Sequence, residues 1–168
     1  MSQHLRRKSR RIRNEYPCIK RLKNGLAPIY FLTGDEPLQM GESADRVRAA
    51  ARQQGYTERE VLEHSAHFDW SSLAGAADSL SLFGERRILD LRLSSPKVGS
   101  EGAKALAEYA VNPPEDSLLL ITAPKLERSQ LTTKWVQALE QTGVLVQIWP
   151  VEGARLPPWI EQRLRRAG

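Results

Sequence analysis

Short apolar segments and amphipathic segments alternate along this chain, and that alternation constrains its fold more than any other feature. The most apolar segment is Ser-Leu-Leu-Leu-Ile-Thr at 117–122, which has no polar face. Such a segment is typical of a strand that is buried on both faces, as in a parallel sheet. Further strands are predicted at 28–32, 87–93 and 144–148, with a weaker one around 60–62.

The segments between these strands have helical periodicity. A helix that ends at Gly55 is expected to turn four side chains inward, namely Leu38, Ala44, Val47 and Ala51. Further helices are expected from about residue 70 to 80, from 103 to 110 and from 129 to 141. Because strand and helix alternate throughout, the sequence predicts a three-layer α/β domain with a mostly parallel sheet.

Charge and proline divide the 168 residues into three parts. Residues 1–24 hold nine Lys and Arg against one Glu, whereas the remainder holds 16 basic and 19 acidic residues. This basic leader is expected to be mostly disordered or to lie upstream of the true start, although its charge could also bind DNA phosphates. Residues 25–150 form the α/β domain. Residues 151–168 begin a new helix at Leu-Pro-Pro-Trp-Ile and are interpreted as the start of a truncated second domain.

Composition excludes several classes of protein. The chain has no apolar run of about 18 residues and no secretory signal pattern, so a cytoplasmic location without a membrane span is expected. Cys18 stands alone, which excludes a disulfide framework. His4, His64 and His67 have no carboxylate-rich cluster near them, so no metal site is expected.

The first strand and helix flank the place where a phosphate-binding loop would lie. That loop needs the pattern G-x-x-x-x-G-K-[ST], because backbone amides surround the phosphates and the Lys neutralises them. Here six residues separate Gly34 from Gly41, and Glu42 precedes Ser43 in place of the Lys. The strand at 117–122 is followed by Ala-Pro-Lys and not by the carboxylates that hold magnesium. We therefore expect neither ATP binding nor any other cofactor, and no catalytic residues.

Leu82 and Phe83 lie at the end of the helix that starts near Trp70, with Asp69 as a plausible N-cap. The buried stripe of this helix is expected to contain Leu73, Ala76, Ala77 and Leu80, and Gly84 ends the helix. At about 100° per residue, Leu82 falls opposite Leu73 and Phe83 lies off the stripe. Two interpretations stay open on spacing alone. The pair either docks into a partner as an apolar wedge or folds back to cap the core.

An ordered series of segments resembles the bacterial DNA polymerase III delta subunit family. The series begins with Ala-Pro-Ile-Tyr-Phe-Leu-Thr-Gly-Asp-Glu-Pro-Leu at 27–38 and continues with Glu-Ser at 42–43 and Ser-Leu-Phe at 81–83. It extends through Arg-Arg-Ile-Leu at 86–89 and Asp-Ser-Leu-Leu-Leu-Ile at 116–121 to Leu-Pro-Pro-Trp-Ile at 156–160. The resemblance covers roughly residues 25–168, whereas residues 1 to about 16 have no recognised counterpart.

The resemblance implies an AAA+-like domain without a working nucleotide site, which is a non-catalytic part of a DNA polymerase holoenzyme. It also implies that Leu82 and Phe83 insert into the beta sliding clamp and help to open its ring during replication. Because the family is about twice as long, the chain is expected to bind the clamp but not to assemble with the other clamp-loader subunits. Two alternative functions remain at this point, namely a degenerate AAA+ ATPase and a DNA-binding module led by the basic leader.

Overall fold

The computed structural model describes residues 11–13, 22, 25–78 and 84–168. Its strands are β1 (Arg11–Arg13), β2 (Ile29–Gly34), β3 (Tyr56–Glu63), β4 (Arg86–Arg92), β5 (Ser117–Ala123) and β6 (Val144–Ile148). Its helices are α2 (Pro37–Gln53), α3 (Ser71–Asp78), α4 (Gly99–Val111), α5 (Arg128–Leu131), α6 (Lys134–Thr142), the short 3-10 helix η1 (Gly153–Arg155) and α7 (Leu156–Ala167). None of the helices in these ranges is long and apolar enough to cross a membrane.

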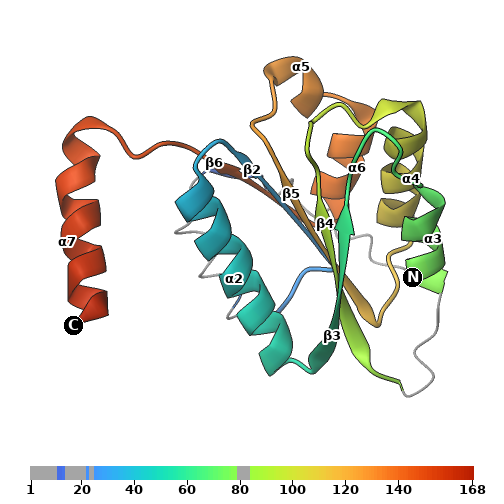
Figure 1. The fold of residues 1–168 in the computed structure, drawn as a ribbon, viewed down its shortest axis with the longest axis horizontal. Coiled ribbons are helices and arrows are strands. Elements are labelled where there is room, and N and C mark those ends of the chain that lie inside the picture. The colour runs from blue at the N-terminus through green and yellow to red at the C-terminus, as the bar shows by residue number, and fades with distance from the viewer. Residues whose placement is uncertain (1–10, 14–21, 23–24, 79–83) are drawn as a thin grey trace, which may run out of the picture.

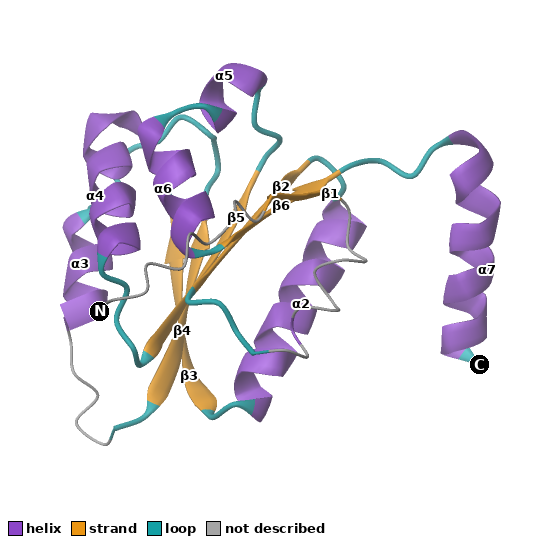
Figure 2. Cartoon of the chain, turned by 180° about the vertical axis from the view of Figure 1, so that it is seen from behind, coloured by secondary structure: helices purple, strands orange, loops and turns teal. Residues whose placement is uncertain are grey.

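The described strands form one parallel sheet in the order β1-β6-β2-β5-β4-β3. Helix α2 covers one face, and α3, α4 and α6 cover the other (Figures 1 and 2). The predicted three-layer α/β architecture with a parallel sheet is therefore confirmed. Strand β5 lies between β2 and β4, and its residues Leu118–Ile121 are fully buried, as expected of a strand that is covered on both faces.

Alternate residues of the central strands supply two separate cores. Phe31, Leu89 and Leu119 pack with side chains of α3, α4 and α6 on one face. On the other face, Leu32 and Leu120 pack with Val47 and other residues of α2. This alternation follows from the two-residue period of a strand. A strand that must serve two cores is necessarily apolar at consecutive positions.

Two expected elements differ from the structure in length. The weak strand expected around 60–62 is the eight-residue β3, in which Tyr56 and Leu62 are buried. Most of its side chains are exposed because it lies at the edge of the sheet, and backbone pairing with β4 forms it despite its polar composition. The single helix expected at 129–141 is divided into α5 and α6 because Thr133 has an extended backbone.

The inward stripe of α2 was predicted correctly except at its start. Ala44, Val47 and Ala51 are buried, but Leu38 is 58% exposed, so that prediction was wrong. Gln39, one position and about 100° further round the helix, takes the inner place. Its side-chain amide donates a hydrogen bond to the carbonyl of Trp149 at 3.4 Å, which fixes the start of α2 against the end of β6.

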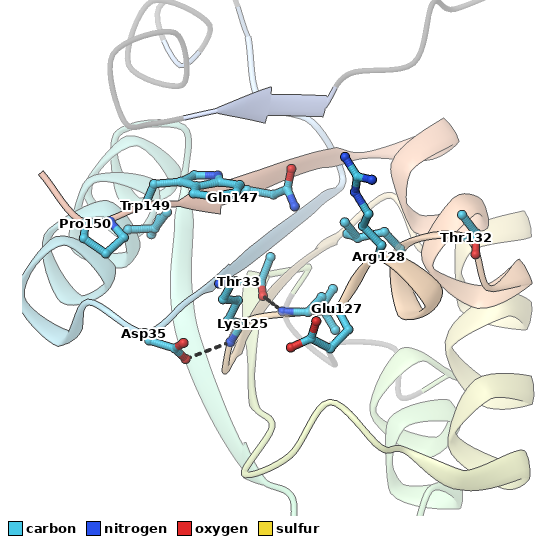
Figure 3. A pocket seen from close by; sticks show the side chains of 12 residues that line it. Thr33, Asp35, Lys125, Glu127, Arg128, Thr132, Gln147, Trp149 and Pro150 are labelled. Atoms are coloured by element: carbon cyan, nitrogen blue, oxygen red, sulfur yellow. Dashed lines mark hydrogen bonds between the residues drawn. The ribbon is translucent and has the colours of Figure 1, made fainter. Parts of the chain in front are cut away.

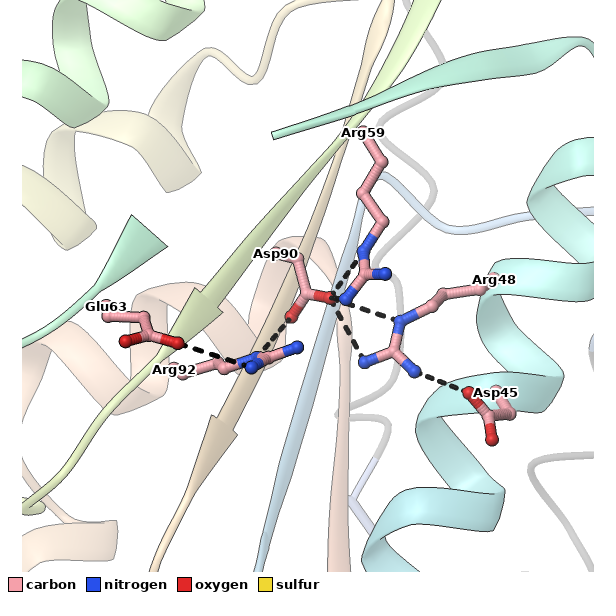
Figure 4. Close-up of polar contacts among 6 residues, drawn as sticks. All are labelled: Asp45, Arg48, Arg59, Glu63, Asp90 and Arg92. Carbon is pink, nitrogen blue, oxygen red and sulfur yellow. Dashed lines mark hydrogen bonds and ion pairs between the residues drawn. The ribbon is translucent and has the colours of Figure 1, made fainter. Parts of the chain in front are cut away.

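A buried carboxylate ties α2 to the sheet (Figure 4). Asp90, in the middle of β4, has no exposed surface. Its Oδ2 accepts hydrogen bonds from Arg48 Nε of α2 at 3.1 Å and from Arg59 Nη2 of β3 at 2.6 Å. Arg92 Nε lies 3.8 Å from the other oxygen. Arg48 and Arg92 also pair with Asp45 and Glu63, respectively.

Part of the basic leader belongs to the sheet. Arg11–Arg13 form β1, which pairs in parallel with β6 and places Ile12 opposite Val146. Most of the remaining leader lies outside the described residues. At the other end, the chain leaves β6 through η1 and continues as α7, which stands beside α2 and away from the sheet (Figures 1 and 2).

Candidate functional site

The carboxyl ends of β2, β5 and β6 meet at one edge of the sheet, which is where parallel α/β domains bind ligands. The end of β2 and the turn that follows it are bonded directly to the turn that follows β5. Thr33 Oγ1 donates to the carbonyl of Pro124 at 2.7 Å and accepts from the Leu126 N–H at 3.1 Å. Asp35 Oδ1 accepts from the Lys125 N–H at 3.0 Å. The polar groups of this first turn are thus used to join strands.

The structure explains the glycine at position 34 in a way that the sequence did not indicate. A Cβ atom on Gly34 would lie 2.4 Å from the carbonyl oxygen of Ile148. The glycine therefore permits the close approach of β2 and β6 at the end of the sheet. A contact between the two strands, and not space for a phosphate, accounts for the residue at this position.

The other two residues of the degenerate loop lie in the first half of α2. Ser43 is buried, with 5% of its surface exposed. The carboxylate of Glu42 accepts two hydrogen bonds from the guanidinium of Arg163 in α7. Pro37 begins α2 and cannot donate a backbone hydrogen bond. The loop that would hold a triphosphate thus presents a carboxylate that is already paired.

The residues that directly follow β4 and β5 do not supply the second half of a hydrolytic site. Strand β5 is followed by Pro124 and Lys125, and β4 ends at Arg92 before Leu93 and Ser94, so no carboxylate follows either strand directly. The described residues contain no group of three His, Cys, Asp or Glu side chains that could hold a metal ion. His64 packs against Phe68 and Trp70, with ring centroids 5.9 and 5.4 Å away.

A pocket of about 600 Å³ opens beside the joined turns (Figure 3). This pocket was not predicted from the sequence. The residues that follow three parallel strands could have indicated it, because ligand pockets form at the carboxyl ends of such strands. Trp149 forms one wall, and Lys125 Nζ lies 5.6 Å from the centre of its ring. Gln147, 9% exposed, also lines the pocket. The rest of the lining comes from Thr33, Asp35, Leu126, Glu127, Arg128, Leu131, Thr132, Ile148 and Pro150.

The proposed wedge residues Leu82 and Phe83 lie outside the described residues, so their orientation stays a prediction. The elements on either side of them are fixed. Asp69 Oδ1 accepts the N–H of Ser71 at 2.9 Å, which agrees with its predicted role at the start of α3. Leu73 is 1% exposed and anchors α3 in the core. After the segment 79–83, Gly84 has a φ of 68° and lies two residues before the start of β4. That conformation favours glycine, so it explains Gly84.

Residues 30–148 match the protein-family model described as DNA polymerase III, delta subunit. The chain is 32% identical over 147 residues to DNA polymerase III subunit delta of Escherichia coli (strain K12), which covers 86% of this chain and 42% of that protein. The chain thus spans less than half the length of the sequence relatives it matches.

Solved structures share the fold. The Bacillus subtilis DNA clamp loader delta protein superposes with a TM-score of 0.61 at 19% identity, over 79% of this chain and 41% of that one. Thermotoga maritima RuvB, in its R170A form, superposes with a TM-score of 0.55 at 12% identity, over 89% and 47% of the two chains. These likenesses confirm the AAA+-like fold.

Proposed function

The chain belongs to the DNA polymerase III delta subunit family, and from this membership we propose that it binds and opens the beta sliding clamp as part of a clamp loader in DNA replication. The observation that carries the proposal is the family match over residues 30–148, which includes the segment with Leu82 and Phe83. We also propose that the other clamp-loader subunits are partners of full-length members of this family.

The described geometry supports a mechanical mode of action. Gly34 is used in strand packing and Glu42 in an ion pair, so neither residue supports nucleotide binding. Helix α3 and β4, on either side of the wedge residues, are anchored by Leu73 and Leu89 in the core. The proposed wedge lies in the segment between these two anchored elements. In this proposal the free energy of binding comes from apolar side-chain surface that is buried in the clamp.

The first test removes the wedge. Leu82→Ala/Phe83→Ala should weaken binding to the cognate beta clamp by about 2–4 kcal/mol, or roughly 30- to 1000-fold, because buried anchors dominate such interfaces. Surface plasmon resonance on immobilised clamp measures the affinity. The melting temperature of the double variant should stay close to that of the wild type.

A matched control is available on α2 and α4. Leu38 and Val111 are 58% and 83% exposed, and Leu38→Ala/Val111→Ala removes two exposed apolar side chains that the proposed wedge does not include. This control should bind the clamp as the wild type does. Unchanged affinity of the wedge variant would refute the proposed site, and unfolding of that variant would show that the two residues belong to the core.

A further inference from the structure

Helix α7 is attached to the α/β domain in an unusual way. It follows β6 and stands apart from the sheet, next to α2 (Figures 1 and 2). Leu156, Ile160 and Leu164 of α7 remain 40%, 43% and 65% exposed, so these three side chains contribute little to holding it there. A polar contact joins α7 to the α/β domain.

Among the described residues, an ion pair between Arg163 and Glu42 joins α7 to α2. Nη1 and Nη2 of Arg163 donate to Oε1 and Oε2 of Glu42, so two parallel hydrogen bonds join the planar groups. This two-bond geometry is the strongest and most directional form of an Arg–carboxylate contact. Each of the two side chains is 29% exposed, so solvent is partly excluded from the pair.

Trp159 orients the Arg163 side chain for this contact. The two residues are four positions apart in α7 and therefore lie on one face of the helix. The guanidinium carbon of Arg163 lies 4.0 Å from the centre of the Trp159 ring. Stacking on the indole restricts the long Arg163 side chain. The side chain therefore loses less conformational entropy when it forms the ion pair with Glu42.

The position of Glu42 relates this ion pair to the degenerate phosphate-binding loop. In the sequence, Glu42 follows Gly41 where a phosphate-binding loop has its Lys, and in the structure it lies in the second turn of α2. A Lys at this position would supply a cation, whereas Glu42 supplies an anion, and α7 supplies the cation that binds it. The carboxylate is thus paired within the protein, at the junction between the α/β domain and the segment that follows it.

We propose that Glu42 and Arg163 form a latch that fixes the orientation of α7 relative to the α/β domain without any nucleotide. The latch explains why a carboxylate, and not merely an uncharged residue, stands at position 42. Because the pair is partly exposed, its attraction is weakened by dissolved salt. The orientation of α7 should therefore be fixed at low ionic strength and become variable at about 1 M salt, where charges are screened beyond about 3 Å.

The experiment measures the distance between the two helices directly. Spin labels are placed at Gln53 of α2 and Ala167 of α7, both exposed, in the full chain with Cys18→Ser, which removes the single cysteine. Double electron–electron resonance then gives the distribution of label separations. The chain with Glu42 and Arg163 intact should give one narrow distribution at low salt and a broad one at about 1 M salt. Glu42→Gln, which keeps the shape and removes the charge, should give the broad distribution at low salt.

The charge-reversed pair makes the test specific for the latch. Arg163→Glu alone should broaden the distribution, and Glu42→Arg/Arg163→Glu should narrow it again because attraction is restored. Arg165→Ala is the matched control, since Arg165 pairs with Glu161 within α7 and not with the α/β domain. It should leave the distribution narrow. A narrow distribution in Glu42→Gln, a broad one in the chain with both residues intact at low salt, or no recovery in the charge-reversed pair would each overturn the proposal.

Discussion

Asp90 shows at the scale of one residue how the domain tolerates charge in its interior. It lies in a strand with Leu89 and Leu91 as neighbours, and its carboxylate is paired with Arg48 and Arg59. Removing Asp90 leaves Arg48, whose side chain is only 14% exposed, with the solvent-exposed Asp45, and it takes from Arg59 its buried carboxylate partner. Asp90→Ala should therefore lower the free energy of unfolding by about 3 kcal/mol.

Urea denaturation followed by circular dichroism measures this loss. Asp45→Ala is the matched control, because Asp45 also pairs with Arg48 but its side chain is 76% exposed. An exposed pair of this kind contributes less than about 1 kcal/mol. Equal losses in the two variants would show that the burial of Asp90 does not matter to stability.

At the scale of the helices, a glycine decides how closely α4 approaches α3. A Cβ atom on Gly102 of α4 would lie 2.5 Å from Cζ2 of Trp70, just before α3. Trp70 cannot move aside easily, because it is 8% exposed and packs edge-on against Phe68 at 4.9 Å. Gly102→Ala should therefore destabilise the domain by about 1–3 kcal/mol, as overpacking usually does, although alanine favours the helix.

Gly41 of α2, unlike Gly102, has open space around it. A Cβ atom there would have no neighbour within 4 Å, so Gly41→Ala should raise the free energy of unfolding by about 0.5–1 kcal/mol through helix propensity. Both variants can be compared in the same urea titration. Stabilisation by Gly102→Ala would mean that Trp70 has room to shift and that the contact is not tight.

At the scale of the whole molecule, the domain retains an AAA+-like fold but uses its former loop region for internal contacts. We expect no saturable heat when magnesium and ATP are titrated to millimolar concentration in a calorimeter. Glu42→Lys alone should not restore binding, because Gly34 still contacts Ile148 and Pro37 still lacks an N–H. A micromolar dissociation constant for ATP in the unmodified chain would contradict this view and favour the ATPase alternative.

The sequence by itself determined the succession of strands and helices from β2 to β6, apart from the division between α5 and α6, because period-2 and period-3.6 patterns are properties of neighbouring residues. It did not predict β1, which lies in the leader that was expected to be mostly disordered. It also indicated the loss of the phosphate loop, since the absence of the Lys and the wrong glycine spacing need no coordinates. The prediction of Leu82 and Phe83 came from the resemblance to a family, and the described residues leave it as a prediction.

Only the tertiary structure decided contacts between residues that are far apart in the chain. Arg48 meets Asp90 across 42 positions and Arg163 meets Glu42 across 121, and neither pair follows from local periodicity. The exposure of Leu38 was likewise set by the packing of Gln39 against Trp149. Local patterns predict which face of an element is apolar, whereas the partner of a charged side chain depends on how the elements pack.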